Sequence, residues 1–286
     1  PKSKLVMLRL KEIADKGFSP TALTGYIRNP IQFYFQKILH ISEVEEVEEN
    51  IALNTLGTII HETLEALYKP FIGKFLSEND ILGCFKLLDD EVLKQFKLVY
   101  KEGEIKKGRN LLAFEVAKRN ISNFLIVELE SIKNDDAIKI LHLEKPCERI
   151  LEHPSLPFPI KFTGKADRIE ERNGVIRIID YKTGKVEKTS VTLKSWKGLT
   201  DEIKNDKIIQ ILAYAYMYEN EASGKPIETG IISFKNLKSG FLPFNFKDGK
   251  EETTIINKDI LSNYLEQIVL LLNEILDEEI PFEEKV

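Results

Sequence analysis

The stretch GKADRIEERNGVIRIIDYKTGK, residues 164 to 185, predicts two β-strands joined by a tight turn. Asn173-Gly174 strongly signals a two-residue hairpin loop, because both central positions need positive φ angles, which Asn and Gly tolerate. With these residues in the loop, Asp167 falls opposite Asp180 on the partner strand. Because side chains alternate along a strand, both aspartates and Lys182 are expected on one face of the hairpin.

The two faces of this hairpin are predicted to differ in character. The face that carries the aspartates also holds three isoleucines, Ile169, Ile176 and Ile178. The opposite face is predicted to carry charged side chains, those of Arg168, Glu170, Arg172 and Arg177.

The opposed aspartates need a cation between them. Directly opposed side chains on paired strands have Cβ atoms roughly 4.5 to 5.5 Å apart, and like charges placed there are destabilising. Lys182 can neutralise part of this charge in a structural salt bridge. Two convergent carboxylates equally match a hard divalent cation such as Mg²⁺ or Mn²⁺. The hairpin alone leaves both interpretations open.

Composition indicates an ordinary globular protein. The chain has 286 residues, 43% of them hydrophobic, and a net charge of -5, so contact with phosphates would require a local basic patch. Cys84 and Cys147 form no recognisable metal-binding or disulfide pattern, which fits a reducing compartment. No membrane-spanning run or signal peptide is evident, so a cytoplasmic location without membrane contact is expected. The start at Pro1 is consistent with a processed chain or an excised segment.

The periodicity of the chain predicts a mixed α/β (α+β) fold. Residues 1 to about 140 read as helical, and a strand period begins at residues 138–151. A helix over 205–223, a strand over 229–237 and a helix over 257–280 follow. The prediction is one domain, 1–286, with a small central mixed sheet flanked by helices. Residues 1–140 are expected to form a helical wrapping, and residues 141–286 are expected to form the catalytic core sheet and the C-terminal helices. The acidic run 42–50 is expected to be a solvated loop or helix end.

Two predicted helices carry polar residues among apolar neighbours. In LNTLGTIIHETLEALY one helical face contains Gly57, His61, Leu64 and Tyr68. A lone helical histidine is commonly structural, but neutral imidazole is also a metal ligand. Gln210 and Tyr214 lie four residues apart, either as a boundary stripe or as a pair that holds a metal ligand, a water or a DNA backbone.

Five segments together resemble the PD-(D/E)XK nuclease superfamily, specifically nuclease domains of the RecB and AddB type. In chain order they are FSPTALTGYIRNPIQFYFQKIL, LGTIIHETLEALY, GKADRIE, IIDYKTGK and QILAYAY, so the resemblance runs from about residue 18 to the C terminus. It implies a core like that of restriction endonucleases.

The resemblance also assigns expected roles in catalysis and metal binding. Asp167 and Asp180 correspond to the carboxylates that bind Mg²⁺, with the Tyr181 carbonyl as a further ligand, and Lys182 corresponds to the catalytic lysine. His61 corresponds to a histidine that completes the metal shell, and Glu144 stands at the place of a glutamate that many relatives carry. Gln210 and Tyr214 match the motif on the helix after the hairpin.

The implied activity is Mg²⁺-dependent hydrolysis of DNA phosphodiester bonds, with Mn²⁺ as an alternative metal. Metal ions lower the pKa of bound water and stabilise charge on the phosphate. The resemblance suggests an exonuclease domain of a recombination or repair system that acts on single strands or DNA ends, with the helicase in another domain or subunit, because no Walker motif is present. The alternatives are a catalytically silent DNA-binding scaffold and a restriction-type endonuclease.

Two further features refine this expectation. Some AddB-type domains bind an iron-sulfur cluster through four cysteines, but here Asn29 precedes Pro30 and no cysteine lies near the C terminus, so no cluster is expected. The loop after Lys182 is rich in lysine, and contact with DNA phosphates is predicted for Lys185, Lys188, Lys194 and Lys197. Trp196 either packs partly buried or stacks on a base.

Overall fold

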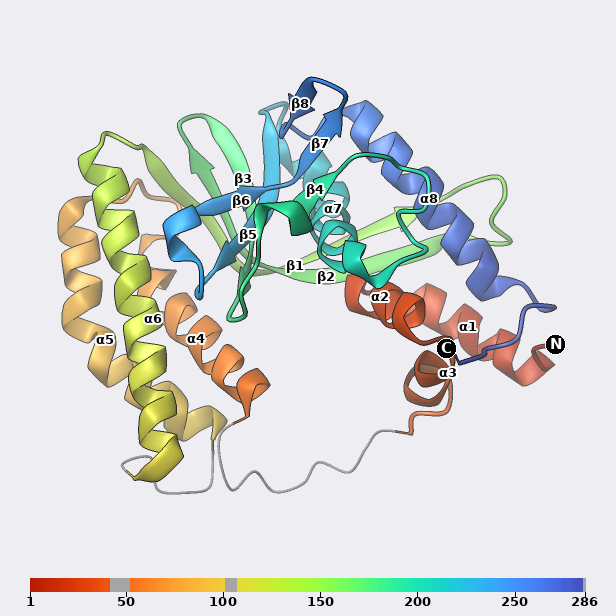
Figure 1. The fold of residues 1–286 in the computed structure, drawn as a ribbon, viewed down its shortest axis with the longest axis horizontal. Helices are drawn as coiled ribbons and strands as arrows, with labels where there is room; N and C mark the ends of the chain where they lie inside the picture. The colour runs from red at the N-terminus through yellow and green to blue at the C-terminus, as the bar shows by residue number, and fades with distance from the viewer. Residues whose placement is uncertain (42–51, 101–106, 285–286) are drawn as a thin grey trace.

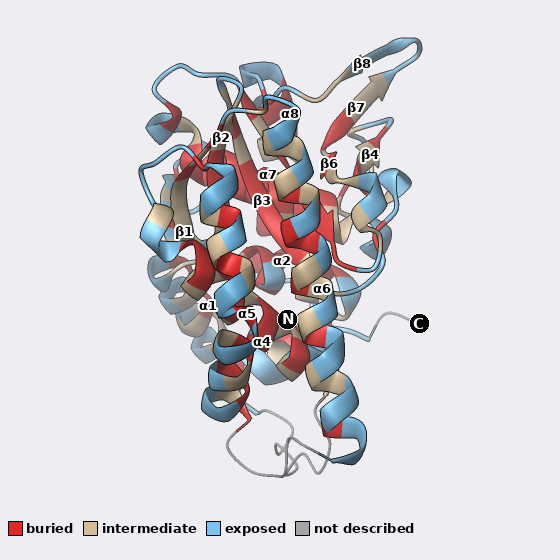
Figure 2. Ribbon diagram, turned by 90° about the vertical axis from the view of Figure 1, so that its left-hand side faces the viewer, coloured by how far each residue is buried: buried red, intermediate tan, exposed pale blue. Residues whose placement is uncertain are grey.

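The computed structural model describes residues 1–41, 52–100 and 107–284. These residues form three layers, with a central sheet between two groups of helices (Figure 1). Figure 2 shows the strands of this sheet as buried segments, whereas the outer faces of the helices are exposed. The predicted fold class, a mixed sheet flanked by helices with a helical N-terminal half, is confirmed.

The central sheet has five strands in the order β1-β2-β3-β5-β6. Adjacent strands are antiparallel except β3 and β5, which are parallel and connected through helix α7, as a crossover between parallel strands requires. The strands are β1 (Ile138–Leu151), β2 (Ile160–Arg172), β3 (Val175–Lys182), β5 (Ile227–Ser233) and β6 (Phe241–Pro243). A second, small sheet contains β4 (Thr192–Leu193), β7 (Asn245–Asp248) and β8 (Glu251–Thr253).

Two separate apolar cores cover the two faces of the central sheet. One core includes α1 (Lys4–Lys16), α2 (Pro20–Arg28), α3 (Pro30–Phe33), α7 (Asp206–Tyr218) and α8 (Lys258–Leu276). The other includes α4 (Leu53–Tyr68), α5 (Glu78–Val99) and α6 (Gly108–Lys133). The N-terminal helices are therefore divided between both faces of the sheet. None of these helices in the described part of the chain combines the length and apolarity needed to cross a membrane.

Short helical turns connect these elements. They are η1 (Tyr34–Ile38), η2 (Lys69–Phe71), η3 (Lys188–Val191), η4 (Ile203–Asn205), η5 (Glu219–Ala222) and η6 (Leu237–Ser239).

Local sequence explains where two of the long helices begin. Ser77 and Asp80 form a reciprocal capping box at the start of α5, and Asn257 caps α8 through its side chain. The acidic run 42–50 lies outside the described residues.

The register predicted for the β2–β3 hairpin is confirmed. Arg172 pairs with Val175, and both turn residues have positive φ, 52° at Asn173 and 84° at Gly174. The backbone pairing recorded for the hairpin ends at Arg168 and Ile179, one residue before the two aspartates. The predicted apolar face is also confirmed, since its three isoleucines belong to the core that contains α7.

The opposite face of the hairpin holds buried ions instead of solvated charges. Arg168 and Glu170 are both 0% exposed, because α4, α5 and α6 cover them. Arg168 and Arg172 compensate Glu170, and both also donate hydrogen bonds to the carboxylate of Glu128 on α6. Tyr181 of β3 is buried on this same side of the sheet.

Candidate functional site

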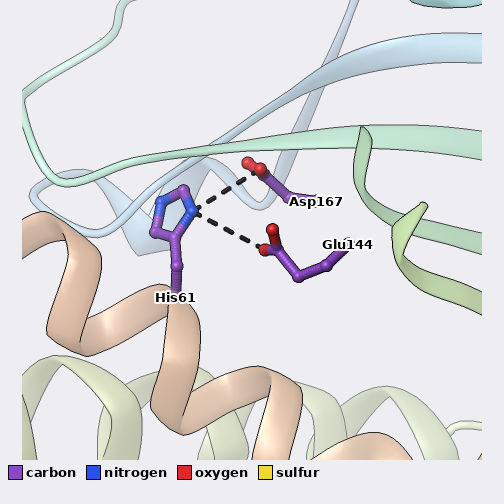
Figure 3. A group of neighbouring side chains, drawn as sticks. All are labelled: His61, Glu144 and Asp167. Atoms are coloured by element: carbon purple, nitrogen blue, oxygen red, sulfur yellow. Dashed lines mark ion pairs between the residues drawn. The ribbon is translucent and has the colours of Figure 1, made fainter. Parts of the chain in front are cut away.

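Three side chains from different elements converge where α4 meets strands β1 and β2 (Figure 3). His61 comes from α4, Glu144 from β1 and Asp167 from β2, and they offer ligand atoms within 4.8 Å of one another. His61 Nδ1 lies 3.5 Å from Asp167 Oδ1 and 4.0 Å from Glu144 Oε1. One imidazole and two carboxylates at this spacing are a donor set suited to a divalent metal ion.

The backbone of β1 is distorted next to Glu144. The register with β2 shifts between Ile140 and His142, and Glu144 has a φ angle of 45°, which non-glycine residues seldom adopt. Such irregularities re-aim side chains and occur often beside active sites. The carboxylate of Glu144 reaches His61 with Oε1, while its Oε2 lies 2.6 Å from Lys165 Nζ.

A second group of polar side chains closes a triangle beside this cluster. Lys182 Nζ lies 2.9 Å from Asp180 Oδ2 and donates a hydrogen bond of 3.0 Å to Gln210 Oε1. Gln210 Nε2 donates in turn to Asp180 Oδ1, also at 3.0 Å. The amide of Gln210 therefore fixes both the ammonium and the carboxylate. Its Nε2 also lies 3.5 Å from the hydroxyl of Tyr214.

The two aspartates of the hairpin occupy different places in this arrangement. Asp167 belongs to the His61 cluster, and its Oδ2 accepts a hydrogen bond of 2.7 Å from the backbone N–H of Tyr181. Asp180 belongs to the lysine triangle and is not among the three clustered donors. The ring of Tyr181 packs edge-on against His61, with centroids 5.7 Å apart.

Burial makes negative charge unfavourable at this site. Burial raises the pKa of Asp180 to about 6, in spite of the nearby Lys182, and it also raises the pKa of Glu144. Burial acts to lower the pKa of His61, but the hydrogen bond and charge of Asp167 outweigh it and raise that pKa. Lys182 compensates only part of this charge, since the pKa of Asp180 stays raised beside it. Buried acids whose charge is only partly compensated fit a divalent cation.

Gly164 permits a close approach at the site, whereas a Cβ at Gly57 would make only ordinary van der Waals contact. A Cβ added to Gly164, the first residue of the hairpin motif, would lie 2.8 Å from Cε1 of Tyr214, so this glycine lets the tyrosine pack against β2. A Cβ on Gly57 would meet Thr183, the residue after Lys182, at 3.7 Å. Gly57 therefore faces the end of β3.

The lysines predicted to contact DNA belong neither to the His61 cluster nor to the triangle of Asp180, Lys182 and Gln210. Lys185 forms an ion pair with Glu187. The other three, Lys188, Lys194 and Lys197, line a hollow beyond the end of β3. Trp196 is partly buried and stacks on Phe246, with centroids 5.2 Å apart, which matches the packing interpretation of this residue.

Sequence reasoning missed three contributors to the site. Lys165 holds Glu144, and the buried pair of Arg168 and Glu128 anchors β2 directly after Asp167. Lys165 lies inside the GKADRIE motif, but nothing in the motif indicates that its partner is on β1. The glutamate on α6 carries no local signal at all.

Comparison with known proteins agrees with this arrangement. The sequence model of the PD-(D/E)XK nuclease superfamily matches residues 17–286. An uncharacterized protein of Rickettsia typhi is 28% identical over 258 residues, which are 86% of this chain and 26% of that protein. An uncharacterized protein of Rickettsia felis is 30% identical over 175 residues, 59% of this chain and 19% of that protein. The chain thus spans about a fifth to a quarter of the length of these relatives.

Among solved structures, the crystal structure of SSO0001 aligns with 87% of this chain and 85% of its own, at 15% identity and a TM-score of 0.23. The family assignment rests on the sequence match, which includes all the residues of the site described above. The chain belongs to the PD-(D/E)XK nuclease superfamily.

Proposed function

We propose that this chain is a Mg²⁺-dependent deoxyribonuclease domain, with Mn²⁺ as an effective substitute. The observation that carries the proposal is the convergence of His61, Glu144 and Asp167 beside the triangle of Asp180, Lys182 and Gln210. A structural salt bridge would need the lysine and one acid. Three further metal-type donors, all partly or fully buried, are unnecessary for that role.

In this proposal the residues divide into metal ligands and groups that act on the substrate. His61, Asp167, Glu144 and Asp180 hold the metal, and the Tyr181 carbonyl is a further ligand. The bound metal supplies an acidified water and a positive charge for the phosphate.

Lys182 is proposed to neutralise charge that develops on the scissile phosphate and to position the attacking water. Gln210 holds the ammonium of Lys182 by accepting its hydrogen bond, and Tyr214 supports Gln210 from the same helix. Asp180 would share its negative charge between the metal and Lys182, while Gln210 holds the ammonium in place.

The wider setting is inferred from the resemblance to RecB-like and AddB-like domains. We place residues 1–286 as one exonuclease domain without an iron-sulfur cluster in a larger cytoplasmic recombination or repair protein, whose helicase lies in another domain or subunit. The preferred substrate is a DNA end or a single strand. A catalytically silent scaffold would have no need to retain Asp180 and Lys182 in contact.

Digestion of end-labelled linear DNA and closed circular duplex tests this proposal. We expect cleavage of the linear substrate with Mg²⁺ or Mn²⁺, no cleavage in EDTA, and sparing of closed duplex circles. Cleavage of circles at a defined sequence would instead support a restriction-type endonuclease, and no cleavage of any DNA with either metal would support the scaffold.

His61→Ala is expected to weaken Mn²⁺ binding by at least about 10- to 100-fold, the loss that is typical even when only a hydrogen-bond partner of a metal ligand is removed. Since a protonated imidazole cannot bind metal, Mn²⁺ affinity of the wild type should rise with pH as His61 deprotonates. That rise should be smaller in the variant. Calorimetric titration with Mn²⁺ at several pH values measures both effects.

His153→Ala provides the matched control, because His153 is exposed and bonded to Ser155 outside the site. Its Mn²⁺ affinity should equal that of the wild type. Equal Mn²⁺ affinities in all three proteins would assign His61 a structural role.

A further inference from the structure

A hollow of about 850 Å³ lies beside the proposed active site, between the segment that follows β3 and the small sheet. Five lysines from separate parts of the chain line it: Lys188, Lys194, Lys197, Lys204 and Lys247. Three acidic residues, Asp201, Glu202 and Glu252, also contribute to its wall. The hollow is therefore positively charged in a chain whose net charge is -5.

The charges of this hollow are unevenly paired. Lys204 lies 2.7 Å from Glu202, and Lys247 lies 2.8 Å from Glu252. Lys188, Lys194 and Lys197 form no ion pair with any described residue, and all three are exposed. Three ammonium groups thus remain for an anionic ligand with several charges.

The wall that carries these lysines is fixed to the fold. Ser233, at the end of β5, accepts a hydrogen bond from the N–H of Val186 and donates one to the carbonyl of Gly184. Asn236 donates to the carbonyl of Val186. Further along, Trp196 stacks on Phe246, which lies in β7 between two residues that line the hollow. The ammonium groups therefore project from anchored backbone.

The hollow lies close to the catalytic groups along α7. Asn205 lines the hollow and ends η4, which leads directly into α7. Gln210, which holds Lys182, is five residues further on, and a helix rises about 1.5 Å per residue, so the separation along the axis is about 7.5 Å.

We propose that this hollow binds the sugar-phosphate backbone of a single DNA strand beside the proposed active site. The placement of this strand relative to the active site rests on the proposed nuclease function. The ligand class follows from the three unpaired ammonium groups and from the volume, which suits a short flexible segment of one strand and not the rigid width of a duplex.

Trp196 allows this binding to be measured without catalysis, because it is the one tryptophan of the chain and lies between Lys194 and Lys197. A single-stranded oligothymidylate is titrated into the full chain in EDTA, and both Trp emission and the anisotropy of labelled DNA are followed. We expect binding to change Trp emission. The triple variant Lys188→Ala, Lys194→Ala, Lys197→Ala should bind at least about tenfold more weakly.

Salt dependence adds a quantitative test. Each phosphate contact with a single strand contributes about 0.7 to the slope of log affinity against log salt, so the triple variant should lose about 2 from that slope. A control triple, Lys16→Ala, Lys86→Ala, Lys258→Ala, removes the same charge from exposed positions on α1, α5 and α8. Its salt slope and affinity should stay close to those of the wild type.

Two results would overturn the proposal. One is an equal loss of affinity in the two triple variants, and the other is duplex binding that depends on Lys188, Lys194 and Lys197 as strongly as single-strand binding does. Neither result bears on the nuclease function, which is tested by cleavage with metal. The protein could also fail to cleave DNA with metal and still bind single strands in EDTA through these lysines. That result would contradict the nuclease function and support binding in the hollow.

Discussion

Asp180→Asn is expected to abolish metal-dependent DNA cleavage while it stabilises the metal-free protein. The substitution keeps the shape of the side chain but removes an anionic metal ligand and the charge that faces Lys182. The loss of rate should be at least on the order of 10² to 10³, the cost of removing one electrostatic group from a transition state. Cleavage of end-labelled linear DNA with Mg²⁺ measures it.

The opposite effect on stability follows from the burial of Asp180. Burial raises the pKa of this carboxyl from 3.8 to about 6, so the folded state binds the proton more tightly than the unfolded state does. The free energy of unfolding therefore falls as the pH rises from about 4 to 6, and stays lower above 6. A shift of about two units corresponds to about 3 kcal/mol.

Asp180→Asn removes this penalty. In EDTA at pH 8 the variant should be more stable than the wild type by up to about 3 kcal/mol, and the difference should shrink toward pH 4. Lys182 loses an ion pair, but its side chain is 31% exposed, so solvation offsets most of that loss. Added Mg²⁺ should stabilise the wild type more than the variant, which keeps only His61, Glu144 and Asp167 as side-chain donors.

Denaturant unfolding at the two pH values checks these expectations. Asp15→Asn, at an exposed position in α1, is the matched control and should show neither the gain in stability nor the loss of cleavage. Wild-type cleavage by Asp180→Asn would remove this residue from the mechanism. A loss of stability at pH 8 would show that its contacts with Lys182 and Gln210 outweigh its desolvation.

The sequence predicted those parts of the site that depend on local rules. Asn173-Gly174 set the hairpin register, and alternation placed the isoleucines in the core. Helical periodicity placed Gln210 and Tyr214 on one face, and the structure brings them within 3.5 Å. Each of these inferences needs only neighbouring residues and a repeat of two or 3.6.

Long-range contacts were beyond the reach of those rules. The position of Glu144 depends on a bulge and a positive φ in β1, neither of which its sequence signals. Lys204 and Lys247 join the basic hollow only because η4 and β7 fold together. The charged face of the hairpin became a buried one because Glu128, 40 residues before Arg168, neutralises it.

Glu128→Ala is expected to destabilise the protein by about 3 to 5 kcal/mol, the cost of leaving a buried charge without its partner. Arg168 is 0% exposed and donates to both oxygens of Glu128, at 3.1 and 3.2 Å. Arg172 and the hydroxyl of Tyr68 donate to the same carboxylate, at 3.0 and 2.8 Å. Denaturant unfolding should show the loss, whereas Glu130→Ala, at an exposed position on the same helix, should stay within about 0.5 kcal/mol of the wild type.

The balance of charge offers a sharper test of this explanation. Glu128 and Glu170 carry two negative charges, and Arg168 and Arg172 carry two positive charges, so the cluster is neutral. Glu128→Ala leaves one positive charge in excess, while the double variant Glu128→Gln, Arg168→Met restores neutrality. The double variant should therefore be more stable than Glu128→Ala. The reverse order would mean that the packing of the Arg168 guanidinium on the Tyr68 ring, 4.8 Å from its centroid, matters more than its charge.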